Sequence, residues 1–302
     1  MYDIIVVGGG PAGMTAALYG LRNGKSVLVI EKAGFGGQIT YSPRVENIPG
    51  FAVVSGNEFA DKFMEQILGQ GADVELEEVC EVIDEGDKKI VKTVEGSAFE
   101  SRTVIIAAGV KHRMLGLEGE NELVGEGISF CAVCDGDFYK GKTVCVAGGG
   151  NSAFVEAVLL ADKCEKVIML QDLPEFTADK KLQEDLFKHD NVLIYTDTKI
   201  LAFVKERGEF AGVEIEKKSS QEKRVIKCDG LFVAIGLIPQ NEPYAALADL
   251  NSYGYFDSAE DCKTKTPGIF VAGDCRSKKV RQVTTACADG AMAALAACDY
   301  LR

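Results

Sequence analysis

One pattern of strand, glycine-rich turn and helix occurs twice in this chain, and it limits the fold more than any other feature. The first copy starts with apolar residues 3–7 and ends with a helical run at residues 14–23. Between them, Gly8 makes the turn, Gly10 lets the backbone approach a pyrophosphate, and Gly13 lets the helix pack closely on the strand. The phosphates would lie at the helix N-terminus. The next predicted strand ends at Glu31, the acidic residue expected to hold the adenosine ribose hydroxyls.

The second copy begins at a predicted strand over residues 143–147. Its turn consists of Gly148-Gly149-Gly150-Asn151-Ser152-Ala153, and its helix is predicted to run through Ala161. Two such turns predict two bound nucleotides. The strand after this helix, residues 166–170, ends at Gln171-Asp172, the position at which a dinucleotide site chooses between NADH and NADPH.

Charge at the end of that strand favours NADH. No Arg, Lys or His occurs over residues 167–179, so a 2'-phosphate would meet the carboxylates of Asp172 and Glu175. A site with like charges and no cationic clamp disfavours the phosphate. The alternative is that Lys180, Lys181 or another distant base meets it.

Two cysteines, Cys131 and Cys134, lie shortly before the second turn. This spacing allows a tight disulfide and lowers the pKa of one thiol, so that it reacts as a thiolate. Asp135 follows directly and is placed to donate a proton. A structural zinc site would need a second pair of Cys or His, and the other cysteines and both histidines stand singly. The pair therefore predicts redox chemistry and no metal site, and the lone cysteines are expected to be small buried hydrophobic residues.

The last predicted strand, residues 268–272, stops at a Gly273-Asp274 pair, and residues 281–286 open the final helix. Reduced flavin carries negative charge at its N1/O2 edge, and the positive end of a helix dipole would stabilise that charge. The alternative is that the Gly-Asp pair is a simple turn.

Composition sets the remaining limits. A chain of 302 residues with 47% hydrophobic content can build two cores of ordinary size. No apolar run approaches the length of a membrane span, and no basic leader precedes the first strand, so we expect a cytoplasmic protein. Ten cysteines outside any disulfide framework agree with a reducing compartment. The net charge of -13 argues against nucleic acid or anionic membranes as partners.

Together these motifs resemble the low-molecular-weight thioredoxin reductase family, essentially from Tyr2 to Leu301. The matching segments fall in the family's order: residues 8–13, 36–38, 46–50, 107–109, 131–136, 148–153, 273–274 and 281–282. The resemblance implies an α/β fold of two Rossmann-like three-layer domains, a non-covalently bound FAD, and a homodimer. It also implies that the middle domain rotates, so that the flavin meets the nicotinamide and the disulfide alternately.

The resemblance also assigns the site residues. FAD would contact Gly8, Gly10, Pro11, Ala12, Gly13, Glu31, Gly37, Gln38, Asn47, Val79, Ala108, Gly109, Gly273, Asp274, Arg281, Gln282 and Val283. The nicotinamide nucleotide would contact Gly148, Gly150, Asn151, Ser152, Ala153, Asp172 and Gly236. Cys134 would exchange electrons with the flavin, Cys131 would attack the partner disulfide, and Asp135 would protonate the departing thiolate.

Two departures from the family concern the nicotinamide site. NADPH-binding members carry His-Arg-Arg and a further Arg where this chain has Gln171-Asp172-Leu173 and Thr177, and their usual His after Gly236 is Leu237 here. Both changes, with the run at residues 173–180, look like the reductase half of the NADH-dependent alkyl hydroperoxide reductase flavoproteins, whose N-terminal thioredoxin-like extension this chain lacks. They affect the choice of electron donor, NADH or NADPH, and leave the chemistry unchanged.

The order of the motifs predicts a discontinuous domain. Residues 1–112 and 243–302 would bind FAD, and residues 113–242 would form an inserted domain with the nucleotide site and the dithiol. The crossings at residues 111–114 and 237–241 would form the hinge.

Two smaller expectations concern local structure. Lys111, His112 and Arg113 are expected to lie in a solvated linker. The alternating apolar residues at 201–204 and 213–216 predict an antiparallel hairpin on the inserted domain.

The leading function is a thioredoxin-disulfide reductase that takes electrons from reduced nicotinamide, with NADH favoured over NADPH. They would pass through FAD to Cys131-Cys134 and on to thioredoxin or a similar small dithiol protein. The alternatives are a flavin-dependent dithiol oxidase, a reductase fed by ferredoxin or a deazaflavin, and a redox-sensing flavoprotein that signals by domain rotation. The intact second turn argues against the oxidase, which has no need of nicotinamide, whereas the missing cationic clamp would suit a ferredoxin-fed enzyme.

Overall fold

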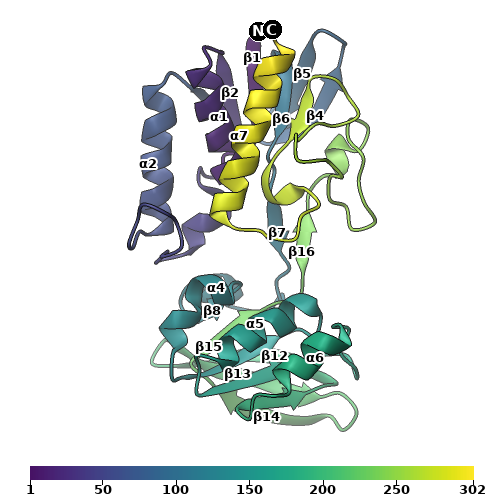
Figure 1. Ribbon diagram of the computed structural model, residues 1–302. Coiled ribbons are helices and arrows are strands. Elements are labelled where there is room, and N and C mark those ends of the chain that lie inside the picture. Colours follow the sequence, from purple (N-terminus) through teal and green to yellow (C-terminus); the bar gives the residue numbers. More distant parts are fainter. The chain divides into compact units, whose positions relative to one another are not determined.

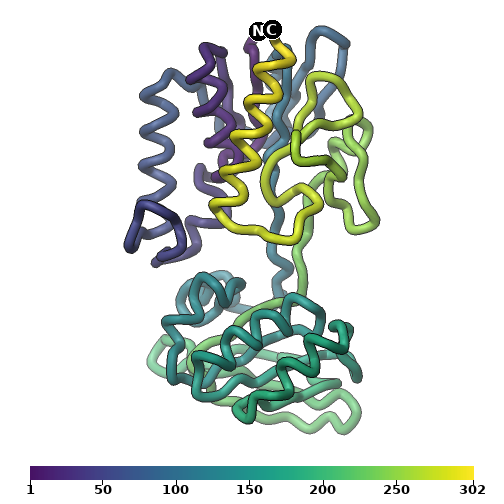
Figure 2. Tube along the Cα trace, in the orientation of Figure 1, coloured from purple at the N-terminus to yellow at the C-terminus, as the bar shows by residue number.

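The computed structural model describes residues 1–302, and the chain divides into two compact units. Unit 1 consists of residues 1–44, 48–111 and 238–302, and unit 2 of residues 112–237 together with 45–47. The chain passes between the units along β7 (Val110–His112) and β16 (Leu237–Pro239), as Figure 2 shows. These two strands pair with each other as a separate sheet.

The unit boundaries differ from the predicted ones at both crossings. Residues 238–242 belong to unit 1, where Asn241 is fully buried and its Nδ2 donates to the carbonyl oxygens of Gly254 and Cys275, each at 2.9 Å. His112 belongs to unit 2, where its ring stacks on Phe130 with a centroid distance of 4.4 Å. The expectation of a solvated linker is therefore wrong for His112, because an aromatic neighbour covers its ring.

A mostly parallel sheet forms the centre of unit 1. Its parallel strands follow the order β3-β2-β1-β6, and β17 pairs with the second half of β6. Two antiparallel strands, β5 and β4, extend from the first half of β6. The strands are β1 (Tyr2–Val7), β2 (Val27–Glu31), β3 (Asp73–Leu76), β4 (Val79–Asp84), β5 (Lys89–Thr93), β6 (Ala98–Ile106) and β17 (Ile269–Val271).

Helices α1 (Pro11–Arg22) and α7 (Val283–Tyr300) pack on each other and on one face of this sheet, with α2 (Gly56–Gly69) beside α1 (Figure 1). The two long helices approach closely because a small residue lies at the contact: a Cβ at Gly290 would lie 2.1 Å from the carbonyl oxygen of Ala12. Short helices η1 (Gly37–Tyr41), η3 (Glu242–Tyr244) and η4 (Gly273–Cys275) complete the unit. No helix of the protein is long and apolar enough to span a membrane.

Unit 2 repeats the design with a parallel sheet of order β11-β10-β9-β15-β8. Helices cover one face and a three-stranded antiparallel sheet, β12-β13-β14, covers the other, which gives three layers with a core on each side of the parallel sheet. The strands are β8 (Ile128–Ser129), β9 (Thr143–Ala147), β10 (Lys166–Leu170), β11 (Val192–Tyr195), β12 (Thr198–Glu206), β13 (Glu209–Lys217), β14 (Glu222–Lys227) and β15 (Gly230–Val233). The helices are α3 (Glu120–Leu123), α4 (Ala132–Asp135), η2 (Gly136–Tyr139), α5 (Asn151–Ala161) and α6 (Lys180–Leu186).

The structure confirms the predicted fold class, an α/β protein with two Rossmann-like sheets. It also confirms the hairpin, as strands β12 and β13, and adds β14, which the sequence does not predict. Ile226 is the one buried residue of β14, so that strand carries no apolar alternation from which it could be recognised.

Candidate functional site

The first glycine turn joins β1 to α1. Gly8 has a φ of 108°, a conformation that favours glycine, and a Cβ there would lie 2.4 Å from the carbonyl oxygen of Ala107. A Cβ at Gly13 would lie 1.8 Å from the carbonyl oxygen of Gly8, so the helix starts directly against the turn. Gly10 is the N-cap of α1, and a Cβ built on it meets nothing within 4 Å. The free space in front of these helix amides suits a pyrophosphate.

Two more predicted residues border this turn. The carboxylate of Glu31, at the end of β2, accepts hydrogen bonds from the backbone N–H of Gly9 at 2.6 Å and of Ala33 at 3.0 Å. Gly37, at the start of η1, lies so near that a Cβ on it would be 3.3 Å from the Cα of Gly10. Residues 8–13, 31 and 37, which are separated in the sequence, therefore form one cluster.

The carboxyl end of β17 joins the same cluster. A Cβ at Gly273 would lie 2.7 Å from the Cβ of Ala12, and the Gly273 N–H donates to Asp289 of α7 at 3.1 Å. Asp274 follows, and its Oδ1 is enclosed without a hydrogen-bond partner, while the ammonium of Lys278 lies 3.9 Å from it. Burial raises the pKa of this carboxyl. An enclosed oxygen of this kind needs a donor, and a hydroxyl of a bound cofactor would supply one.

The start of α7 carries the next three predicted residues. Arg281 donates from Nε to the carbonyl oxygen of Asp274 at 3.3 Å, and its guanidinium lies 4.3 Å from the ring centroid of Tyr255. Gln282 is the N-cap, and Val283 is the first residue of this eighteen-residue helix. The positive end of its dipole lies at these residues.

Of the remaining residues predicted to contact FAD, some lie at the cluster around the first glycine turn and others do not. Ala108 lies beside the turn, since a Cβ at Gly8 would be 3.4 Å from its Cα, and Gly109 follows with a φ of 64°. Val79 begins β4 and packs in the core on the sheet face opposite α1. Asn47 lies between η1 and α2. The structure therefore joins Ala108 to the cluster and leaves Val79 apart from it.

The second turn joins β9 to α5 in the same manner. Gly148 has a φ of 130°, and a Cβ there would lie 2.5 Å from the carbonyl oxygen of Ala234. Gly150 is the N-cap of α5. Asn151 and Asp179 form two reciprocal hydrogen bonds. Asn151 Nδ2 donates to Asp179 Oδ2 at 3.0 Å, and the Asp179 N–H donates to Asn151 Oδ1 at 2.8 Å.

The other residues predicted for this nucleotide site have different surroundings. Ser152 is exposed and Ala153 is buried in the first turn of α5. The carbonyl oxygen of Gly236, which has a φ of 117°, accepts a hydrogen bond from the N–H of Arg113 at 2.9 Å. Gly236 is thereby tied to the crossing segment rather than to the turn.

Beside Asp172 lies a lysine that could not be recognised from the sequence of the strand. Lys218, from the turn between β13 and β14, donates from Nζ to the carbonyl oxygen of Asp172 at 2.6 Å and lies 3.9 Å from its Oδ2. Gln171 is buried, and its Nε2 donates to the carbonyl oxygen of Glu175 at 3.3 Å. A base distant in the sequence, the alternative left open for this strand end, therefore lies beside Asp172.

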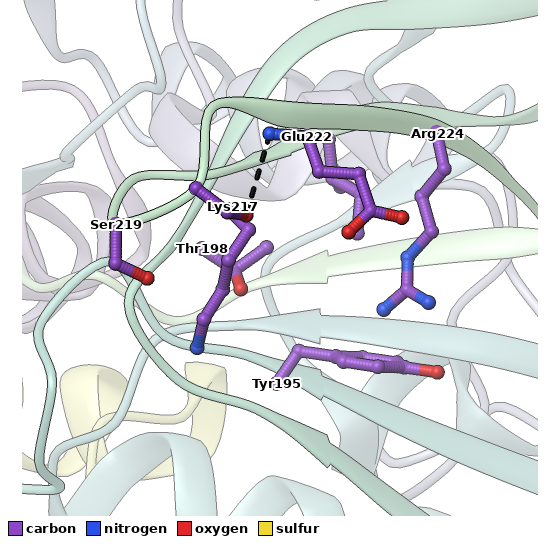
Figure 3. Close-up of a pocket in the computed structure, with 8 residues that line it drawn as sticks. Tyr195, Thr198, Lys217, Ser219, Glu222 and Arg224 are labelled. Carbon is purple, nitrogen blue, oxygen red and sulfur yellow. Dashed lines mark hydrogen bonds between the residues drawn. The ribbon is translucent and has the colours of Figure 1, made fainter.

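Next to Lys218 in the chain, a cavity of about 400 Å³ opens over the end of β11. Figure 3 shows the Arg224 guanidinium over the ring of Tyr195, and the distance to the ring centroid is 4.1 Å. Lys217 donates to the carbonyl oxygen of Thr196 at 2.8 Å. No residue predicted for a cofactor lines this cavity, and its two cations already have partners.

The two cysteines form a disulfide with a Cα–Cα distance of 5.3 Å. Cys131 is the N-cap of α4, and its Sγ accepts a hydrogen bond from the N–H of Cys134 at 3.2 Å. The Ser129 hydroxyl donates to Asp135 Oδ2 at 2.6 Å and accepts from the N–H of Cys131 at 3.1 Å. Asp135 Oδ1 is enclosed and unpartnered, and burial raises the pKa of this carboxyl. The arrangement favours the protonated acid beside the disulfide, which suits proton transfer to a sulfur.

Two polar residues in the surroundings of Asp135 are not identified by sequence reasoning. Ser129 precedes the cysteine pair and shows no motif of its own, and Glu156 is the only charged residue in the mostly apolar helix at residues 151–161. The prediction for the lone cysteines is confirmed for most of them, since six are buried, whereas Cys80 is exposed and Cys287 is partly buried.

Residues 2–290 match the family described as pyridine nucleotide-disulphide oxidoreductase. The thioredoxin reductase of Bacillus subtilis is 39% identical over 302 residues, covering 100% of this chain and 95% of that protein. A 34.2 kDa protein in the rubredoxin operon of Clostridium pasteurianum is 39% identical over 99% of this chain and 97% of its own length. The crystal structure of thioredoxin reductase from Streptococcus pyogenes matches with a TM-score of 0.94 at 36% identity, covering 100% of this chain and 98% of that one. The chain belongs to the pyridine nucleotide-disulphide oxidoreductases, within the low-molecular-weight thioredoxin reductase family, and is an FAD-dependent disulfide oxidoreductase.

Proposed function

We propose that the protein reduces the disulfide of thioredoxin or of a similar small dithiol protein, with NADH favoured over NADPH as the electron donor. The observation that carries the proposal is the Cys131–Cys134 disulfide with the enclosed carboxyl of Asp135 beside it, in the same unit as the second glycine turn. Similarity over the whole chain to proteins named thioredoxin reductase supports this choice of partner.

Unit 1 would hold FAD. The amides at the start of α1 would bind its pyrophosphate, Glu31 would accept hydrogen bonds from ribose hydroxyls, and the unpaired Oδ1 of Asp274 would accept one from a further hydroxyl. The open space at Gly10 and the enclosed oxygen of Asp274 fit such a cofactor. Bound FAD supplies two-electron transfer between a nicotinamide and a disulfide. Its contacts with Gln38, Asn47, Val79, Ala108, Gly109, Arg281, Gln282 and Val283 stay predictions.

Within the dithiol, Cys131 would attack the disulfide of the partner protein and Cys134 would be the sulfur that faces the flavin. Asp135 would protonate the departing thiolate. The hydrogen bond from Ser129 holds Oδ2 of that carboxyl and leaves Oδ1 for the transferred proton, which supports this assignment.

The preference for NADH rests on charge at the end of β10. A 2'-phosphate there would meet Asp172 and Glu175, and the exposed side chain of Lys218 offsets part of that repulsion because it lies 3.9 Å from Asp172 Oδ2. We therefore expect NADH to be favoured about tenfold in kcat/KM, equivalent to about 1.4 kcal/mol. Replacing Lys218 by Ala would raise the factor, because it removes the only offset among these groups.

Anaerobic titration of the FAD-loaded protein with NADH or NADPH, followed by turnover with oxidised thioredoxin, tests the proposal. Loss of flavin absorbance with NADH, and a higher kcat/KM with NADH than with NADPH, are expected. Equal or better use of NADPH would refute the charge argument. If neither nicotinamide reduces the flavin but reduced ferredoxin does, the donor is an external reductant. Oxygen uptake driven by a small dithiol would indicate an oxidase instead, and sedimentation of the same sample tests the expected homodimer.

A further inference from the structure

Glu156 carries an enclosed carboxyl in unit 2, and the proposed function assigns no role to it. Its Oε2 has no hydrogen-bond partner, and the Oδ1 of Asp135 is enclosed and unpartnered in the same way. Leaving two such oxygens without donors inside a protein is costly when both groups are ionised. The cost falls if one proton is held between two neighbouring carboxyls, because like charges at a shared site cannot both persist cheaply.

Helix α4, which carries Asp135, packs on α5, which carries Glu156 (Figure 1). Gly136, the residue after Asp135, lies against α5, since a Cβ there would be 3.4 Å from Leu160 Cδ2. Glu156 precedes Leu160 by four residues, so the two share one face of the helix. Glu156 therefore lies under the end of α4 that carries Asp135.

We propose that Asp135 and Glu156 share one proton, and that Glu156 is a positioning residue that returns a proton from water to Asp135 each time the Cys131–Cys134 disulfide opens. The inference rests on the proposed function, because it needs Asp135 to be the acid of the dithiol. The inference adds the carboxyl of Glu156 as a partner of Asp135 in proton donation.

The proton balance can be written for opening by an external dithiol. The thiolate of that dithiol attacks one sulfur, a new S–S bond forms, and the Cys131–Cys134 bond breaks so that the other sulfur leaves with the electron pair. Asp135 transfers the shared proton to this leaving sulfur, which leaves both carboxyls ionised. Glu156 then takes up a proton from water and passes it to Asp135, so that the pair again holds one proton. In the reverse direction each proton moves back along the same path.

The electrostatics of the surroundings agree with a shared proton. Burial, with a smaller contribution from the charge of Asp135, raises the pKa of Glu156 to about 8. Burial also raises the pKa of Tyr139, the other titratable group beside Asp135, to about 12, so its phenol stays protonated at neutral pH. The nearby cation Lys163 is paired with Asp137 at 2.8 Å. A pair of this kind titrates as a unit, and its last proton is lost above neutral pH.

The test follows the opening of the disulfide by dithiothreitol in the FAD-loaded protein from pH 6 to pH 9, with each rate divided by the concentration of dithiothreitol thiolate. In the wild type the corrected rate should fall with a midpoint near pH 8, as the pair loses its last proton. In Glu156→Gln that midpoint should move down by about one pH unit or more, so that the rate at pH 7.5 drops several-fold. Glu165→Gln, which removes an exposed carboxylate just after α5, is the matched control and should keep the wild-type midpoint.

An infrared measurement keeps the inference testable if Glu156→Gln folds poorly. With isotope-labelled glutamate, the wild type should show the carbonyl band of a protonated carboxyl at pH 7, and in Asp135→Asn this band should titrate at lower pH, because the like charge is gone. A midpoint unchanged in Glu156→Gln, or a Glu156 band that Asp135→Asn does not move, would overturn the shared proton. Neither readout uses thioredoxin or nicotinamide, so a failure of the proposed function would be recognised separately.

Discussion

At the residue scale, burial sets the protonation of Asp135 and of the titratable groups around it in unit 2. Burial is the main reason why the pKa values of Asp135, Tyr139 and Glu156 are raised. Asp137, only two residues beyond Asp135, is exposed, and its hydrogen bond with Lys163 lowers its pKa. The protonated carboxyl of Asp135 therefore lies on the inner side of this short segment, and the charged carboxylate of Asp137 lies on its outer side.

The two cysteines should differ when each is replaced by serine. Cys134→Ser should keep bound FAD and its reduction by NADH, while thioredoxin reduction falls to the background level, because the sulfur proposed to exchange electrons with the flavin is gone. Cys131→Ser should leave a thiolate in contact with oxidised flavin, visible as a long-wavelength absorbance band. Cys80→Ser, at the exposed lone cysteine, is the control and should behave as the wild type. A band in Cys134→Ser and none in Cys131→Ser would exchange the two roles.

At the scale of elements, the glycine turns were the most predictable part of the molecule. The bounds of β9 and β10 and the end of α5 agree with the sequence prediction, because strand, turn and helix are neighbours in the chain and each limits the next. The contact of Lys218 with Asp172 could not be predicted in this way. It depends on how the turn after β13 folds over the end of β10, a long-range arrangement that no local periodicity encodes.

The same reasoning applies to the crossing strands and to the proton donors. His112 reads as part of a charged linker, and only the packing of β7 reveals Phe130 over its ring. Glu156 lies on a helix whose C-terminal end is predicted correctly, yet its enclosure depends on α4, a separate element. Which residues carry the motifs was therefore predictable, whereas the burial of their polar neighbours was not.

We expect the stability of the folded protein to depend on pH through His112 of β7. Burial lowers its pKa to about 4, below the ordinary value of about 6.5, so the unfolded chain binds the proton more tightly than the folded one. Stability contributed by the neutral ring is complete above pH 6.5 and is lost as the pH falls toward 4. Between pH 7 and pH 5 this loss should be about 1 to 2 kcal/mol in urea unfolding. His112→Phe should remove it, because a phenyl ring can stack on Phe130 without titrating.

His189 supplies the matched control, since it is the only other histidine of the chain. His189→Gln should leave the loss of stability between pH 7 and pH 5 unchanged. An undiminished loss in His112→Phe would mean that other groups, such as the carboxylates whose pKa values are lowered in the folded state, account for the acid sensitivity.

At the scale of the whole molecule, the chain builds the same nucleotide-binding design twice. Each unit has one core cluster on either face of its own parallel sheet. The two glycine turns are equivalent: Gly8 lies against the carbonyl oxygen of Ala107 and Gly148 against that of Ala234, and both have a positive φ. Because no core cluster is shared by the two units, damage to one turn should stay within its unit.

Gly8→Ala and Gly148→Ala are therefore expected to act separately. Each places a Cβ within 2.5 Å of a backbone oxygen at a positive φ, which costs on the order of 1 to 3 kcal/mol. Gly8→Ala should weaken FAD binding, measured by flavin release, while ADP-ribose still binds unit 2 with its wild-type affinity. Gly148→Ala should do the reverse.

Two further glycines serve as controls that distinguish the effect of the Cβ clash from the effect of backbone strain. Gly24 and Gly141 have φ values of 70° and 71°, and a Cβ on either meets nothing within 4 Å. Their Ala variants should lose some stability through strain and keep both ligands, because neither residue lies in a turn that receives phosphate. Loss of both ligands in Gly8→Ala or in Gly148→Ala alone would show that the units do not hold their nucleotides independently. The expected rotation of one unit against the other would then have to break a shared structure, whereas two self-sufficient units can rotate while each keeps its own nucleotide.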